Sequence, residues 1–154
     1  MNERRTRPNV VPWPPLLIVG LTALAIALQV ILPIDPGFSS SRILGAVLIV
    51  AALTIDLWAM KTLNDGRTTI LPNRGSSHLV TKGPFQFSRN PIYLANLILM
   101  VGLGLFFGNG WMLLLAPVDA LLTHILAVKR EENHLIAMFG FEYEAYCRRV
   151  RRWI

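Results

Sequence analysis

The sequence predicts an all-α polytopic membrane protein with four transmembrane helices. Of its 154 residues, 53% are hydrophobic and 16% are charged, whereas soluble domains carry about 25% charged residues. The mean hydropathy is +0.48, and the apolar residues form long blocks separated by polar gaps. We therefore expect a single integral membrane domain over residues 1–154, in which residues 1–63 form an N-terminal two-helix part and residues 64–154 a second part.

The first two apolar runs predict the two helices of the N-terminal part. Pro14 to Leu32 holds 19 residues without a charge, close to the roughly 20 that cross a bilayer. Proline suits the first turn of a helix, and Pro33 ends this run. The second run extends from Arg42 to Leu63. Residues 64–90 then form a polar segment, which we expect to be mostly loop with room for one short surface helix.

The third and fourth runs predict a helical hairpin. The third run is Pro91 to Phe107, and Gly108-Asn109-Gly110 is a tight turn. The fourth run starts at Trp111 and is apolar to Val128, with nothing to stop the helix before about Phe139. Gly140 is a plausible stop. The tail from Glu142 to Ile154 alternates aromatic residues with arginines, which predicts a short amphipathic helix at the lipid surface.

The positions of the basic residues predict the orientation. Fourteen of the 15 Lys and Arg residues lie at the two ends of the chain and in the segment before the third run, which four crossings would place on one side. The positive-inside rule then puts both termini and the polar segment in the cytoplasm. We expect the bacterial inner (plasma) membrane as the location. The basic charge sits in the gaps between apolar runs, so it favours membrane lipid and not nucleic acid as a partner.

Ser88-Arg89-Asn90-Pro91 is the first cluster that could carry chemistry. Asn90 is a good N-cap and Pro91 suits the next position. The free N–H groups of the helix start, with Arg89, could hold a carboxylate or phosphate. The alternative is a capped helix whose arginine contacts lipid headgroups.

Glu131-Glu132 is the second cluster. Adjacent residues on a helix point about 100° apart, so at most one acid faces the hairpin partner, and the other faces solvent or pairs with an arginine. An inward carboxylate could bind a ribose or an ammonium group. The alternative is a solvated helix end balanced by Lys129 and Arg130.

Other polar residues leave their roles open. Asp56, Asp119 and His124 lie within apolar runs, where they either line a cavity or make interhelical hydrogen bonds. A single cysteine, Cys147, and histidines without ligand spacing give no metal motif.

In combination, these segments resemble the isoprenylcysteine carboxyl methyltransferase family and its phospholipid methyltransferase relatives. The resemblance covers roughly residues 64–154 and rests on LVTKGPFQFSRNPIYLA, a hairpin, and KREENHLIAMFGFEYEAYCRRVRRW. The family pattern is Arg-His-Pro-x-Tyr-x-Gly followed by Glu-Glu. The matching residues are Arg89, Pro91, Tyr93, Glu131 and Glu132, while Asn90 replaces the histidine and Ala95 the glycine.

The resemblance implies an S-adenosylmethionine-dependent methyltransferase, with O-methylation the expected chemistry, acting on a lipophilic or prenylated acceptor at the cytoplasmic face. It implies Arg89, Asn90 and Tyr93 as catalytic residues. It implies a cofactor pocket made by Asn90, Pro91, Tyr93, Glu131, Glu132, Tyr143 and Tyr146, with no metal. Two other readings stay open: a membrane reductase using a nicotinamide cofactor, and a non-enzymatic lipid-binding scaffold. The sequence leaves the acceptor and the oligomeric state open.

Overall fold

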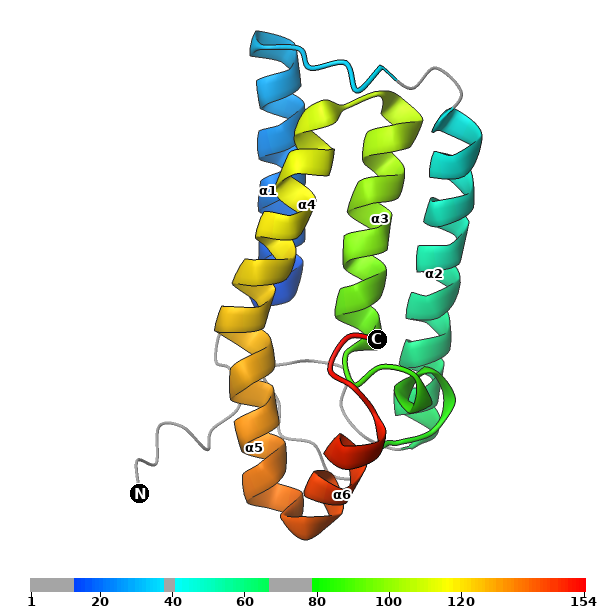
Figure 1. The fold of residues 1–154 in the computed structure, drawn as a ribbon, viewed down its shortest axis with the longest axis vertical. Coiled ribbons are helices and arrows are strands. Elements are labelled where there is room, and N and C mark those ends of the chain that lie inside the picture. Colours follow the sequence, from blue (N-terminus) through cyan, green and yellow to red (C-terminus); the bar gives the residue numbers. More distant parts are fainter. Residues whose placement is uncertain (1–12, 38–40, 67–78) are drawn as a thin grey trace.

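The structure is a computed structural model that describes residues 13–37, 41–66 and 79–154. Within these ranges every regular element is a helix. The bundle consists of α1 (Trp13–Ile31), α2 (Ser41–Asp65), α3 (Pro91–Phe107) and α4 (Gly110–Thr123), which run side by side (Figure 1). Arg4, Arg5 and Arg7 lie outside the described residues, as do residues 67–78 of the polar segment.

The helix boundaries follow the proline and glycine signals closely. Helix α3 has the predicted bounds, and α1 and α2 differ from the predicted runs by one or two residues. The α3–α4 turn forms because Gly108 adopts a left-handed conformation (φ 68°). The Asn109 side chain then accepts a hydrogen bond from the Met112 N–H and donates one to the Ala25 carbonyl of α1, at 3.1 and 3.2 Å. This buried asparagine ties the hairpin to the first helix.

Small residues allow α2 and α3 to pack closely. Gly45, Ala52 and Ala59 recur every seven residues along α2 and are buried, as are Ala95 and Gly102 of α3. A Cβ added at Gly45 would lie 2.5 Å from the Phe106 backbone nitrogen. Small residues let helix backbones approach closely, which favours helix association in a membrane. The hydrophobic effect contributes little to this association, because lipid tails are as apolar as the side chains they replace.

The long helix predicted after the turn is present and has an irregular centre. Helix α4 passes through a π-helical segment, η3 (His124–Val128), into α5 (Lys129–Phe139) and stops before Gly140, as predicted. Together these elements extend well below the bundle, and α6 (Phe141–Arg149) turns back toward the start of α3 (Figure 1). The short 3₁₀ helix η2 (Gly83–Gln86) is the surface helix for which the polar segment had room.

Among the described residues, three helical stretches are long and apolar enough to cross a membrane: Trp13–Ile31, Arg42–Asp65 and Gly110–Arg149, the last of which contains α4, η3, α5 and α6. At 17 residues, α3 falls short of this length criterion. The helix formed by α4, η3 and α5 would be about 45 Å long if it were straight, longer than the roughly 30 Å hydrocarbon thickness, so part of it must lie outside the bilayer. The polar stretch after Val128 is the part that the sequence excludes from the apolar core.

The prediction for the tail was wrong in one respect. The helix expected to reach Ile154 ends at Arg149, and Val150 is extended. Residues 151–154 run back beside the start of α3, because the Arg151 carbonyl accepts a hydrogen bond from the Arg89 N–H at 3.0 Å. We call residues 150–154 the terminal strap.

Candidate functional site

The two polar clusters predicted from the sequence meet at one end of the bundle. Tyr93, in the first turn of α3, donates a hydrogen bond of 2.6 Å from its hydroxyl to Glu131 Oε1 on α5. Arg89 Nη1 lies 3.1 Å from Glu132 Oε1. The hairpin therefore joins residues about 40 positions apart in the chain through two direct polar contacts.

The two glutamates face different partners, as their 100° separation requires. Glu131 faces α3 through Tyr93. Glu132 is 8% exposed and pairs with two arginines: Arg89, and Arg152 of the terminal strap. Arg152 binds it in a bidentate manner, with Nε 2.9 Å from Oε1 and Nη2 2.6 Å from Oε2. Such a planar, two-point pair is the strong form of an arginine–carboxylate contact.

The environment of Glu131 raises the pKa of its carboxyl group. Glu131 follows the apolar run and lies outside it. Burial raises the pKa of its carboxyl to about 7; the hydrogen bond from Tyr93 opposes this rise and the charge of Glu132 adds to it. Near neutral pH this carboxyl can therefore be either charged or protonated, which is a property of many ligand-binding carboxyls.

Asn90 occupies the N-cap position of α3 but does not cap the helix with its side chain, contrary to the expectation from sequence. Its Nδ2 instead donates to the Arg152 carbonyl at 3.0 Å, and its own N–H donates to Ser88 Oγ at 3.1 Å. The Ser88 hydroxyl also donates to the Arg152 carbonyl, at 3.3 Å. The strap therefore takes the hydrogen bonds that a cap would have used. Pro91 is at the first helical position, as predicted.

Arg89 is not free to receive an anion in the way the sequence suggested. Besides Glu132, its Nη1 contacts Cys147 Sγ at 2.6 Å, and its side chain is 13% exposed. Its Nε is buried and has no hydrogen-bond partner. An anionic group in this site could therefore be recognised through Nε.

Tyr143 and Tyr146 of α6 are almost fully buried and form a small core with Val150, against which Leu79, Leu135 and Phe139 pack. The Tyr146 hydroxyl donates to the Phe85 carbonyl at 2.6 Å. Burial raises the pKa of both phenols, so both are neutral at physiological pH. The two tyrosines fasten α6 below the glutamates.

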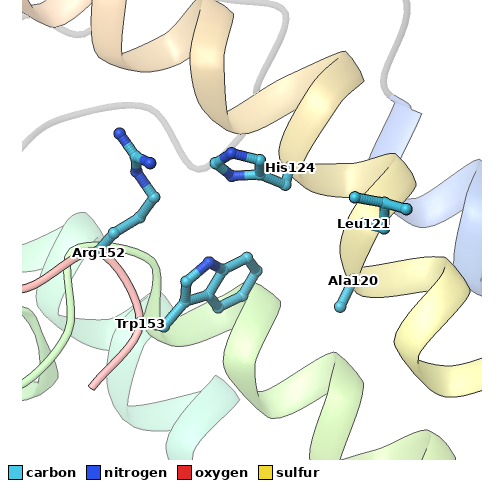
Figure 2. A pocket seen from close by; sticks show the side chains of 5 residues that line it. All are labelled: Ala120, Leu121, His124, Arg152 and Trp153. Carbon is cyan, nitrogen blue, oxygen red and sulfur yellow. The ribbon is translucent and has the colours of Figure 1, made fainter.

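An open pocket of about 350 Å³ lies beside this network and is lined by Ala120, Leu121, His124, Arg152 and Trp153. Figure 2 shows His124 on the long helix and Trp153 on the strap on opposite sides of it, with Arg152 nearby. The rings of His124 and Trp153 are 6.5 Å apart, and His124 Nδ1 is buried without a partner. Asp56 and Asp119 do not line this pocket, although each has a buried Oδ1 without a partner.

Sequence reasoning missed Arg152 and Trp153 as site residues, because it treated the basic tail as a lipid anchor. One signal was present: four arginines and a tryptophan lie within the six residues 148–153, shortly after two tyrosines. A pairing between Arg152 and Glu132, 20 residues earlier, could not be read from spacing alone.

The apolar helices and the buried charged cluster at one end define an integral membrane protein with a site where two helices and a tail converge. Comparison with known proteins identifies the family. The phospholipid methyltransferase family profile matches residues 40–142, so the chain belongs to that family, as its sequence motifs predicted.

Two curated relatives resemble the chain. The nickel-cobalt-cadmium resistance protein NccN of Alcaligenes xylosoxydans xylosoxydans is 33% identical over 105 residues, which cover 65% of this chain and 48% of that protein. The chain thus aligns with about half the length of that relative. An uncharacterized protein of Haemophilus influenzae is 33% identical over 63 residues, covering 41% of this chain and all of that protein. No solved structure is significantly similar to the chain.

Proposed function

We propose that the protein transfers a methyl group from S-adenosylmethionine to a lipophilic acceptor at the cytoplasmic face of the membrane. Family membership supports methyl transfer. One observation supports particular residues as the site: the two family motifs are in direct contact, Tyr93 with Glu131 and Arg89 with Glu132. In this proposal α3 also crosses the membrane, which brings the number of transmembrane helices to four, and both termini are cytoplasmic.

The residues at the site suit this cofactor. S-adenosylmethionine carries a sulfonium, an ammonium, a carboxylate and ribose hydroxyls. The carboxyls of Glu131 and Glu132 can accept hydrogen bonds from ammonium or hydroxyl groups, and the unpartnered Arg89 Nε can donate one to a carboxylate. When bound, the cofactor would supply an electrophilic methyl group.

The protein's own residues would bind, orient and exclude water. Tyr93 holds the Glu131 carboxyl in a fixed direction, and Arg89 does the same for Glu132. Asn90 and Ser88 keep the strap across the start of α3. Methyl transfer is an in-line displacement that depends on positioning and on removal of water more than on a strong base.

The first test is isothermal titration of S-adenosylmethionine into detergent-purified protein. We expect saturable binding that Glu132→Ala and Arg89→Ala each weaken by about tenfold or more. The first removes a carboxylate of the site and leaves the partly buried Arg89 without its ion pair, and the second removes the Nε donor proposed for the cofactor carboxylate. Glu142→Ala, an exposed acid on α6, is the matched control and should bind as the wild type does. Absence of binding to folded wild-type protein would refute the proposal.

Two alternatives remain and have their own outcomes. A nicotinamide-dependent membrane reductase predicts binding of the reduced dinucleotide in the same titration. A non-enzymatic lipid-binding scaffold predicts that neither cofactor binds, and that Glu132→Ala changes only stability. The acceptor, and whether oxygen, nitrogen or sulfur is methylated, would be sought after cofactor binding is established.

A further inference from the structure

We infer that Arg152 is a gate that occupies the cation-binding position at Glu132, and that a cationic ligand must displace it to reach this carboxylate. The inference rests on the proposed function, because it concerns the regulation of the same site. It follows from three features of the terminal strap: what the Arg152 side chain covers, how the strap backbone is anchored, and where the pocket lies.

The Arg152 side chain covers the acid of the site most suited to an organic cation. Its Nε and Nη2 bind both oxygens of Glu132, at 2.9 and 2.6 Å. A guanidinium in this position fills the space and charge that an ammonium or sulfonium group would fill. With Arg89 also on Oε1, two positive charges already share one carboxylate, so an incoming cation would meet net repulsion.

The strap backbone is held independently of this side chain. The Arg152 carbonyl accepts hydrogen bonds from Asn90 Nδ2 and Ser88 Oγ, and the Arg151 carbonyl accepts one from the Arg89 N–H. None of these bonds uses the guanidinium. The Arg152 side chain can therefore leave Glu132 while the strap remains in place.

The two arginines differ in their freedom to move. The Arg152 side chain is 38% exposed, whereas that of Arg89 is 13% exposed and is fixed by a further contact with Cys147. Arg152 also lines the open pocket with His124 and Trp153, whereas Glu132, its ion-pair partner, does not line that pocket. Movement of one side chain would therefore connect the pocket to Glu132. Arg89 would stay as a permanent partner of the carboxylate.

The test is the sign of the effect of Arg152→Gln on affinity for S-adenosylmethionine, measured by isothermal titration in nonionic detergent. A gate predicts that the variant binds about five- to tenfold more tightly, since it loses a competing ion pair worth that much at a partly exposed site. Arg152→Lys keeps the charge but not the two-point contact, and should fall between the wild type and Arg152→Gln. A purely structural role predicts weaker binding by both variants.

Two further arms keep the result interpretable. In a Glu132→Gln background, Arg152→Gln should change affinity less than twofold, because the contact for which the ligand competes is gone. Arg149→Gln, an exposed arginine of α6, is the matched control for lost charge and should leave affinity unchanged. The melting temperature of each variant, from circular dichroism, shows whether it is folded.

The possible results distinguish failure of the gate from failure of the proposed function. If wild type and all variants fail to bind the cofactor, the proposed function fails. If the wild type binds and Arg152→Gln binds equally or more weakly, the gate is refuted and the proposed function stands. If Arg152→Gln does not fold, equal or weaker binding by Arg152→Lys than by the wild type refutes the gate, and tighter binding supports it.

Discussion

Substitution of Gly45 by alanine tests whether close packing of α2 against α3 holds the site in place. An added Cβ would lie 2.5 Å from the Phe106 nitrogen and 2.8 Å from the Gly102 carbonyl oxygen. Both atoms are backbone atoms of α3, so no side chain can rotate away. Ordinary contact begins at 3.4 Å, so the helices would have to separate by about 0.9 Å, the difference between 3.4 and 2.5 Å.

This displacement has an energetic and a functional consequence. Overpacking of this kind typically costs about 1–3 kcal/mol in the free energy of unfolding. The separation is comparable to the 1 Å misplacement that can lower a catalytic rate by about 10²-fold, and α3 carries Tyr93 at its first turn. We therefore expect Gly45→Ala to weaken both stability and cofactor binding.

The assay is unfolding of the protein in mixed micelles, followed by circular dichroism as the fraction of sodium dodecyl sulfate is increased. Gly20→Ala on α1 is the matched control, since a Cβ there meets no atom within 4 Å. Gly20→Ala should match the wild type or exceed it slightly, because alanine favours helix over glycine. Equal unfolding midpoints for Gly45→Ala and the wild type would refute the reasoning about the helix interface.

Three other predictions concern hydrogen bonds and charge. Asn109→Ala should lower the free energy of unfolding by about 1–3 kcal/mol, because it removes the cap of α4 and the buried side-chain hydrogen bond to the Ala25 carbonyl of α1; exposed Asn133→Ala should not, in the same micelle titration. Tyr146→Phe should lower the melting temperature by leaving the Phe85 carbonyl without its partner, and an unchanged value would contradict that role. Because burial raises the pKa of Glu131 to about 7 from 4.5, its contribution to stability is present below pH 4.5 and is lost as the pH rises through about 7. Affinity for a cation should rise over the same range, and Glu131→Gln should flatten both profiles; identical profiles for the variant and the wild type would contradict the assignment.

Much of the fold could be predicted because its boundaries are local. Proline at the first position of α3 and glycine in the left-handed conformation after it define that helix within a few residues. The long helix likewise stops at Gly140, where sequence placed the stop. These helix boundaries depend on the backbone preferences of single residues, proline and glycine, which can be read directly from the sequence.

The details of the site depended on contacts between distant residues. Asn90 was expected to cap its own helix, but the strap offers it a carbonyl from 62 residues away. Arg89 was expected to face a ligand, but it pairs with Glu132 in the structure. Sequence identifies which polar residues are available, whereas tertiary packing decides which of them neutralise one another.

The π-helical segment at His124–Val128 determines the direction in which the side chains of α5 point around the helix axis. A π-helical turn accommodates about one residue more than an α-helical turn, so it behaves as an insertion within a helix that never breaks. Relative to an uninterrupted α-helix, the residues of α5 are rotated by about 100° around the axis. Deleting one residue from this segment would let the helix run through regularly and would leave Glu131 facing Tyr93, whereas a regular α-helix of unchanged length would turn Glu131 away from Tyr93 by about 100°. The alignment of the two motifs is therefore a matter of helical register. Cofactor binding that survives a folded single-residue deletion within His124–Val128 would support this account, and loss of binding in that variant would contradict it.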